Sequence, residues 1–220
     1  MTPKLVIFDC DGVLVDSEGP VAEVVSANLV RHGLPLTPDE VDRLFTGGTL
    51  DRTAARAREM GARLPDSWVA ETYGEIYARL RQGVPLIPGI LDLIAALDAA
   101  RIPRWVASNG TFEKMRITLT PSGLWDLFDG RILSREILPA KPAPDMILHA
   151  IAAEGVAHAE AVMIDDSVTG CTAALNAGVR CLGFAAQGDG AALAAAGAEV
   201  VRTMAEVRAR LLGAPEDVLG

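Results

Sequence analysis

Carboxylates are paired at two places in the sequence, and each pair follows a short apolar run. Asp9 and Asp11 follow the stretch Lys4–Phe8, and Asp165 and Asp166 follow a second such run. Side chains two residues apart on an extended segment point the same way, so Asp9 and Asp11 should project together. Two acids this close repel each other unless a cation or a shared proton lies between them. If the two pairs face each other, their oxygens suit an octahedral Mg²⁺.

Two further loops carry groups that suit a phosphate. Ser108, Asn109 and Gly110 offer a hydroxyl and a turn of backbone N–H groups. Lys141 is one of three lysines in a chain with 17 arginines, which indicates that this position requires a compact point charge rather than a planar guanidinium group. Each feature alone also has an ordinary explanation: a helix cap for the acids and the serine, and a solvated loop for the lysine. Four such signals at strand ends are harder to attribute to coincidence.

The segments that would position these residues alternate between strand and helix. After Pro85 the chain carries amphipathic helical segments that lead into short apolar strands, and this alternation predicts a Rossmann-like parallel sheet covered by helices on both faces. The carboxyl ends of parallel strands meet at one edge, where such sheets bind ligands. The expected strands are Lys4–Phe8, Arg104–Ser108, a short strand near 130–133, Ala161–Asp165, Val179–Phe184 and Glu199–Val201.

The region between the first strand and the rest reads as helical throughout. Thr37-Pro38-Asp39-Glu40 is a capping box, which predicts a helix start. A later helix is expected over 66–82, with an apolar stripe that should form the core of this region: Val69, Tyr73, Ile76, Tyr77 and Leu80. We therefore predict an α/β core over 1–16 and 85–220, and an inserted all-helical domain over 17–84.

Composition excludes several classes of partner. The chain has 220 residues, a formal net charge of -9 and a sequence pI near 4.8, which argues against nucleic acid and anionic membranes as partners. The sequence has neither a membrane-spanning apolar run nor a signal peptide, so we expect a cytoplasmic protein. The three cysteines lack metal-ligand spacing, which favours simple packing roles. The oligomeric state is left open.

Four segments together resemble the motifs of a known family, the haloacid dehalogenase-like phosphohydrolases with a helical cap. They read FDCDGVLVDSE at 8–18, SNG at 108–110, KPAPD at 141–145 and IDDS at 164–167. Within that family the chain is similar to bacterial sugar-phosphate phosphatases close to the β-phosphoglucomutases, in particular those acting on 6-phosphogluconate. The resemblance implies an Mg²⁺-dependent phosphatase that hydrolyses a small phosphorylated metabolite through an aspartyl phosphate, with 17–84 as its cap.

The resemblance also implies a role for each motif residue. Asp9 would be the nucleophile, and Asp11 would protonate the leaving oxygen and then activate water. Ser108 and Lys141 would hold phosphoryl oxygens, with Asn109 assisting.

The expected metal ligands are the Asp9 carboxylate, the Asp11 carbonyl and Asp166, with Asp165 nearby or bound through water. In the cap, TGGTLDR at 46–52 resembles the family's substrate loop, with Thr49 in place of serine and Arg52 as a candidate contact to a negative group of the substrate.

Two alternatives remain at this level. A β-phosphoglucomutase-like phosphotransferase shares the nucleophile but carries a histidine twelve residues after it and a cap lysine, whereas this chain has Val21 and no lysine between Lys4 and Lys114. A non-enzymatic phosphoaccepting receiver module also combines acids and a lysine on a parallel sheet, but in a different order and without a helical insertion.

Overall fold

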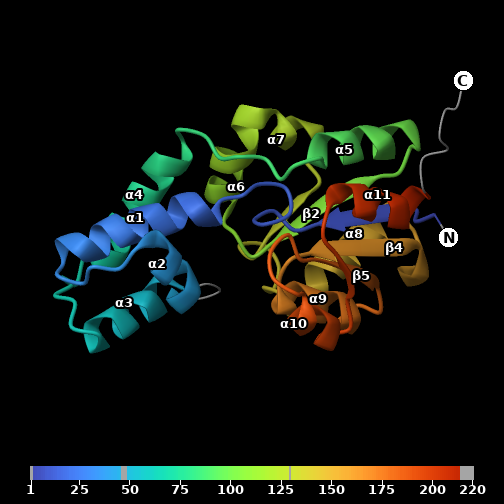
Figure 1. Cartoon of the computed structure of the whole chain (residues 1–220). Helices are drawn as coiled ribbons and strands as arrows, with labels where there is room; N and C mark the ends of the chain where they lie inside the picture. The colour runs from blue at the N-terminus through green and yellow to red at the C-terminus, as the bar shows by residue number, and fades with distance from the viewer. Residues whose placement is uncertain (1, 46–48, 129, 214–220) are drawn as a thin grey trace, which may run out of the picture. The chain divides into compact units, whose positions relative to one another are not determined.

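The structure, a computed structural model, describes residues 2–45, 49–128 and 130–213. The chain divides into two compact units (Figure 1). The first, called here the core unit, comprises Met1–Val15 and Leu86–Gly220, and the second, the helical unit, comprises Asp16–Pro85.

The core unit is built on a six-stranded sheet in the order β3-β2-β1-β4-β5-β6, with every neighbouring pair parallel. Phe8 lies opposite both Val106 and Ile164, so the central strand and its two neighbours end at the same edge. The order also changes direction at the central strand, and such a switch point is where open sheets bind ligands. This architecture confirms the predicted α/β class. The strands are β1 (Leu5–Phe8), β2 (Arg104–Ser108), β3 (Ile132–Ser134), β4 (Ala161–Asp165), β5 (Arg180–Phe184) and β6 (Glu199–Val201).

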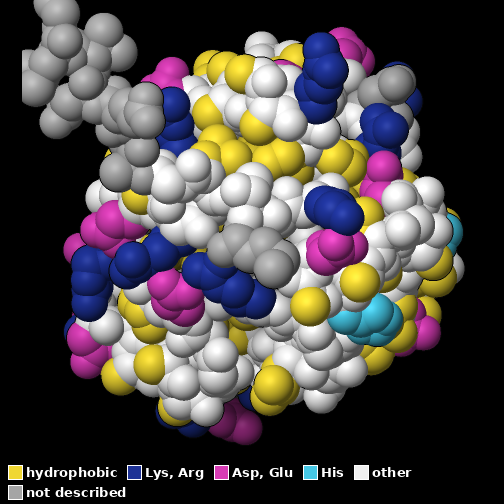
Figure 2. All heavy atoms as spheres, turned by 90° about the vertical axis from the view of Figure 1, so that its right-hand side faces the viewer, with side chains coloured by type: hydrophobic (Ala, Val, Ile, Leu, Met, Phe, Trp, Pro, Cys, Tyr) yellow, Lys and Arg dark blue, Asp and Glu magenta, His cyan; other side chains and the backbone are white. Residues whose placement is uncertain are grey.

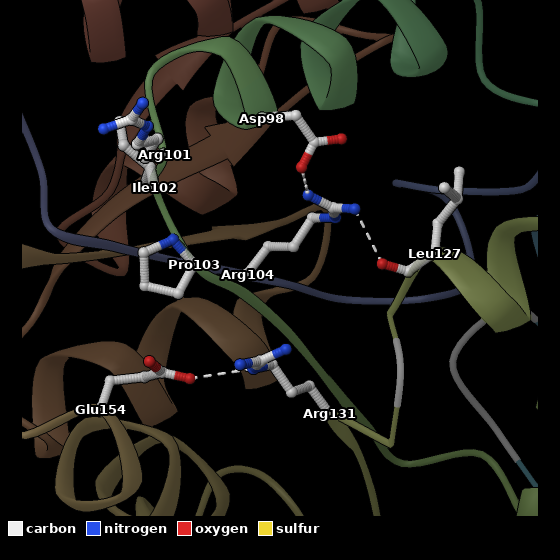
Figure 3. Close-up of a pocket in the computed structure, with 8 residues that line it drawn as sticks. All are labelled: Asp98, Arg101, Ile102, Pro103, Arg104, Leu127, Arg131 and Glu154. Atoms are coloured by element: carbon white, nitrogen blue, oxygen red, sulfur yellow. Dashed lines mark hydrogen bonds and ion pairs between the residues drawn. The ribbon is translucent and has the colours of Figure 1, made fainter.

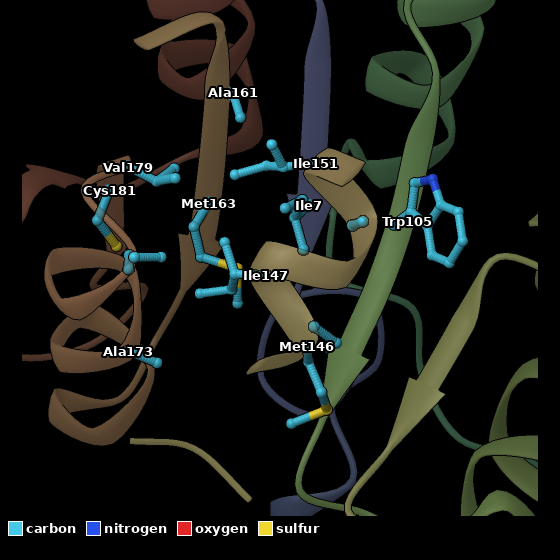
Figure 4. Close-up of a cluster of buried hydrophobic side chains, with 14 of the residues drawn as sticks. Ile7, Trp105, Met146, Ile147, Ile151, Ala161, Met163, Ala173, Val179 and Cys181 are labelled. Carbon is cyan, nitrogen blue, oxygen red and sulfur yellow. The ribbon is translucent and has the colours of Figure 1, made fainter. Parts of the chain in front are cut away.

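Helices cover both faces of this sheet (Figure 1). They are α5 (Ile90–Ala99), α6 (Phe112–Leu119), α7 (Leu124–Leu127), α8 (Asp145–Glu154), α9 (Val168–Asn176), α10 (Ala191–Ala195) and α11 (Met204–Leu212). On one face, α8 and α9 pack on the central strands through Ile7, Ile147, Met163 and Ala173 (Figure 4). Burying a side chain such as Ile147 contributes roughly 1.5–3 kcal/mol. Every residue of β1 and β4 is buried, which explains why β1 is apolar throughout and β4 is apolar up to Asp165.

The helical unit contains α1 (Glu18–Arg31), α2 (Pro38–Phe45), α3 (Leu50–Glu59) and α4 (Trp68–Leu80). The predicted capping box begins α2: Thr37 N donates to Glu40 Oε2 at 2.8 Å, and Glu40 N donates to Thr37 Oγ1 at 3.3 Å. Helices α1 and α4 pack together around a polar group, in which Trp68 Nε1 donates to Asn28 Oδ1 and Asn28 Nδ2 donates to Glu75. Asn28 is tolerated in this core because its amide is hydrogen-bonded.

The predicted stripe of α4 is correct at Ile76 and Leu80 but not at its other positions. Its buried face consists of Trp68, Thr72, Ile76 and Leu80, whereas Tyr73 is 37% exposed. Trp68 is the largest fully buried side chain and has a partner in α1, so the face that contains it turns inward. Two tyrosines, which tolerate exposure of one end, take the outer positions.

Two other details of the core unit differ from the sequence prediction. The third strand runs over Ile132–Ser134 rather than near 130–133, and a short helix, α7, was not expected. All three cysteines are free and buried, in agreement with packing roles. Within the described ranges, no helix combines the length and apolarity that crossing a membrane requires.

Candidate active site

The first acid pair lies at the end of β1, in the middle of the sheet. Asp9 N donates to Ile164 O at 2.9 Å, so the pairing of β1 with β4 continues to this residue. The chain then turns at Gly12, whose φ of +77° suits glycine. A Cβ atom on Gly12 would lie 1.8 Å from Asp166 Oδ2, so only glycine leaves room for this second carboxylate. The turn therefore brings the two acid pairs together.

Lys141 is the cation that faces these acids. Its Nζ lies 2.9 Å from Asp9 Oδ1 and 2.7 Å from Asp165 Oδ2, and its side chain is 2% exposed. Asn109 fixes the backbone of this residue: Asn109 Nδ2 donates to Lys141 O at 3.0 Å, and Lys141 N donates to Asn109 Oδ1 at 2.8 Å. Asn109 thus holds the lysine loop, while its predicted contact with substrate stays a prediction.

Burial and neighbouring charges shift the titration of this pair. Burial raises the pKa of Asp9 to about 7, with Lys141 opposing and Asp165 and Asp11 reinforcing the rise. Burial alone would lower the pKa of Lys141, but Asp165 and Asp9 outweigh it and hold that pKa above its usual range. The lysine is therefore a permanent positive charge beside a carboxyl group that ionises near neutral pH.

Asp165 and Asp166 are adjacent in the sequence but have different surroundings. Asp165 accepts from Ser167 N at 2.9 Å and Ser167 Oγ at 2.7 Å on one oxygen, and from Lys141 on the other. A Cβ on Gly170 would lie 1.8 Å from Asp165 Oδ2, so α9 approaches this carboxylate closely. Since both its oxygens are engaged, Asp165 is suited to orienting Lys141, and direct metal binding by Asp166 stays a prediction.

The acids fit a divalent cation. Carboxylate oxygens of Asp9, Asp165 and Asp166 lie within 4.8 Å of one another. Asp9 Oδ1 is buried and accepts no hydrogen bond, although Lys141 Nζ lies 2.9 Å from it as an ion-pair partner. A buried oxygen without a hydrogen-bond donor is suited to bind a metal ion, and an all-oxygen donor set favours Mg²⁺. The Asp11 carboxylate is not part of this group and faces Lys114 instead.

Ser108 ends the neighbouring strand, β2. Its side chain is almost fully buried, and its Oγ accepts from Gly110 N at 3.0 Å, which folds the segment 108–110 into a tight turn. Ser134, at the end of β3, donates to Gly110 O at 2.7 Å and fixes the turn from the other side. The core unit thus places Asp9 and Ser108 at adjacent strand ends and Lys141 in the loop after β3, in keeping with the sequence prediction.

Sequence reasoning missed one residue of this cluster. Lys114 Nζ lies 2.8 Å from Asp11 Oδ2, although the two residues are far apart in the sequence. The available signal was the scarcity of lysine, because Lys114 and Lys141 are two of only three.

The two predicted cap residues lie in the helical unit. Thr49 is the N-cap of α3 and accepts from Arg52 N at 3.4 Å, and both residues are exposed. Residues 46–48 of the predicted substrate loop lie outside the described residues. Substrate contacts of Thr49 and Arg52 stay predictions.

A hollow of about 390 Å³ lies at the opposite, amino end of the strands (Figure 3). Both of its acids are matched by arginines within the hollow: Arg104 pairs with Asp98, and Arg131 pairs with Glu154 at 3.0 Å. The face drawn in Figure 2 likewise carries basic side chains directly beside acidic ones. This end of the sheet shows no gathering of unmatched acids among the described residues, unlike the carboxyl end.

A model of the haloacid dehalogenase-like hydrolases matches residues 3–178, so the chain belongs to this family. The membership predicted from the four motifs is confirmed, and the protein is a hydrolase.

Particular relatives are similar along nearly the whole chain. Validoxylamine A 7'-phosphate phosphatase of Streptomyces hygroscopicus subsp. limoneus is 29% identical over 213 residues, which cover 93% of this chain and 96% of that protein. The 6-phosphogluconate phosphatase of Escherichia coli (strain K12) is 31% identical over 186 residues, 83% of each chain. The crystal structure of a hydrolase of this family from Deinococcus radiodurans R1, with bound phosphate and sodium, is 32% identical with a TM-score of 0.85, over 96% of this chain and 95% of that one.

Proposed function

We propose that this hydrolase removes phosphate from a small phosphorylated metabolite through an aspartyl-phosphate intermediate on Asp9. The enzyme is a phosphoric monoester hydrolase, in keeping with its family and its phosphatase relatives. The observation that carries the proposed chemistry is the setting of Asp9: a buried carboxylate at a strand end, 2.9 Å from Lys141 Nζ, with a second acid two residues further on. A nucleophile and a proton donor are the two groups that such a reaction needs.

In the first step, a carboxylate oxygen of Asp9 forms a bond to phosphorus while the bond from phosphorus to the leaving oxygen breaks. Asp11 gives its proton to that oxygen, so a neutral alcohol departs. Lys141 favours the ionised form of Asp9, which is the form that attacks. Lys141 and Ser108 hold phosphoryl oxygens and stabilise the negative charge that is spread over them.

In the second step, a water molecule attacks the phosphorus of the aspartyl phosphate. The Asp11 carboxylate takes a proton from this water, and the bond between phosphorus and Asp9 breaks. Inorganic phosphate leaves, Asp9 is again a carboxylate and Asp11 again carries its proton, so the enzyme returns to its starting state.

Mg²⁺ fits the acid cluster as the cofactor. Asp9 and Asp166 would hold it with side-chain oxygens and Asp11 with its backbone carbonyl, while Asp165 stays bound to Lys141 and Ser167. When bound, Mg²⁺ supplies positive charge that offsets the charge of the phosphoryl group.

The substrate class rests on the relatives and on the inserted unit. The names of two relatives give 6-phosphogluconate and validoxylamine A 7'-phosphate as their substrates, which supports a phosphorylated sugar or a similar metabolite. The helical unit acts as a cap that selects the substrate, with Thr49 and Arg52 as contacts. Cytoplasmic location and the absence of nucleic-acid and membrane partners stay predictions.

A panel of phosphorylated metabolites with Mg²⁺ tests this proposal. We expect release of inorganic phosphate with sugar phosphates or 6-phosphogluconate among the best substrates. Steady turnover of p-nitrophenyl phosphate would exclude a phosphoaccepting receiver, which is not a turnover catalyst. Conversion of β-glucose 1-phosphate into glucose 6-phosphate faster than phosphate release, in the presence of glucose 1,6-bisphosphate, would favour the mutase instead.

A further inference from the structure

Lys114 forms an ion pair with Asp11 that has no part in the reaction outlined above. The Lys114 Nζ atom lies 2.8 Å from Asp11 Oδ2, and each side chain is 24% exposed. Both residues belong to the core unit. The acid that handles both protons of the reaction thus has a cation of its own, separate from the Lys141 that faces Asp9.

The position of Lys114 is unfavourable for a lysine unless the charge is used. It lies in the first turn of α6, where the helix dipole disfavours a cation. Its side chain is only 24% exposed, and partial burial also disfavours an unpaired charge. The ion pair with Asp11 therefore compensates for both effects.

The backbone beneath Lys114 is fixed at three points. Lys114 N donates to Thr111 Oγ1 at 3.1 Å, and Phe112 N donates to the Glu136 carboxylate at 2.6 Å. Just before the helix, Gly110 O accepts from Ser134 at 2.7 Å. These bonds tie the start of α6 to the end of β3, so the ammonium group extends from a rigid support.

We propose that Lys114 is a positioning residue that holds the Asp11 carboxyl group in line with the leaving oxygen and then with the attacking water. This inference rests on the proposed function and adds a residue to it. Lys114 acts through Asp11 by donating to its Oδ2 atom, which can accept whether or not the carboxyl group carries a proton, so the loss of Lys114 lowers the fraction of Asp11 that is aligned for proton transfer. Binding of the phosphate group, which Lys141 and Ser108 carry, is left in place.

The leaving group gives the readout that a structural role would not change. We compare Lys114→Met with wild type on a sugar phosphate, whose alcohol needs a proton to leave, and on p-nitrophenyl phosphate, whose phenolate does not. For the sugar phosphate, kcat should fall by about 10- to 100-fold, since general acid–base help is typically worth 10² to 10⁴ and Asp11 itself remains. KM should change less than about threefold, because only proton transfer is impaired.

For p-nitrophenyl phosphate, the first step should stay fast while the second, which needs Asp11 as a base, becomes limiting. A burst approaching one p-nitrophenol per enzyme should then precede slow turnover. Lys114→Arg keeps the charge and should recover part of kcat.

Lys4→Met is the matched control. Lys4 also pairs with a carboxylate at 2.7 Å, that of Glu160, but lies at the opposite end of β1. The Lys4→Met variant should therefore have the kcat of wild type. Thermal unfolding verifies that each variant is folded, and Lys114→Gln takes the place of Lys114→Met if the latter is not.

A raised KM with unchanged kcat would overturn the positioning role, because Lys114 would then bind substrate directly. An unaltered kcat, as in Lys4→Met, would overturn it as well. Wild-type protein that turns over neither ester would overturn the proposed function and the positioning role together, so the two failures are distinguishable.

Discussion

The two ends of the sheet both carry ion pairs, but the pairs differ in burial and in the ratio of acids to bases. At the carboxyl end, Lys141 lies between Asp9 and Asp165 with 2% of its side chain exposed. At the amino end, Arg131 and Glu154 form a pair in which 43% and 18% of the side chains are exposed. Exposed pairs of the second kind are worth about 0–1 kcal/mol. Buried, unequally matched charges cost far more to maintain, so their presence indicates a functional site.

The largest expected contrast between the two ends is in catalysis. Asp9→Asn should abolish turnover, because an amide neither attacks phosphorus nor carries the charge that a cation needs. Phosphate release in steady state is the measurement. Residual activity above about a hundredth of wild type would contradict the role of Asp9 as nucleophile, since acid–base help alone gives 10² to 10⁴.

Removal of divalent cations should lower turnover, which depends on the carboxyl end, and should have no effect on the ion pairs of the amino end. EDTA should lower kcat at least about tenfold, because metal ions contribute several kcal/mol of charge stabilisation in phosphoryl transfer. Added Mg²⁺ should restore the rate. The Tm of Arg131→Met, the amino-end variant described below, should change on addition of EDTA by the same amount as the Tm of wild type. Turnover that is unchanged by EDTA would remove Mg²⁺ from the mechanism.

A smaller effect is expected on the stability of the metal-free protein. The pKa of Asp9 is about 7 in the folded chain against an ordinary value of 3.8, so the folded state binds more protons between these values. Protonated Asp9 therefore stabilises the folded state at low pH, and this stabilisation is lost as pH rises through about 7. In EDTA at pH 8, Asp9→Asn should raise the Tm by about 2–4 °C, or about 1 kcal/mol. The gain should vanish towards pH 4, and a gain that is independent of pH would contradict this account.

The smallest effect is expected at the amino end. Arg131→Met removes one partner of an exposed pair, so kcat should be unchanged and the Tm should shift by less than about 3 °C. A loss of activity comparable to that of the site variants would mean that the two ends of the sheet are coupled.

The sequence was most informative where strand geometry determines side-chain position. Asp9, Ser108 and Asp165 end or follow buried apolar runs, and parallel strands bring such ends together without further information. Lys141 could be added because it lies between two prolines in a chain poor in lysine. Each of these signals lies within a few residues of the side chain that it concerns, so the sequence alone was enough to predict the place of that side chain in the fold.

Other features depended on contacts that a linear pattern does not contain. The pairing of Lys114 with Asp11 joins a helix start to a turn more than a hundred residues away. The phase of α4 was determined by the partner that Trp68 finds in α1. In both cases a side chain on another element, rather than the periodicity of the segment, decided the outcome.

Gly170 has a consequence for anyone engineering this protein for stability. It lies inside α9, where its backbone is helical and where replacing glycine by alanine ordinarily gains about 1 kcal/mol. A stabilisation scheme based on helix propensity would therefore choose Gly170→Ala among its first substitutions. The added methyl group would meet the Asp165 carboxylate at 1.8 Å and displace the group that holds Lys141. Gly170→Ala should therefore lower turnover, and displacement of this buried carboxylate should also offset the expected gain in helix stability, at a position that itself does no chemistry.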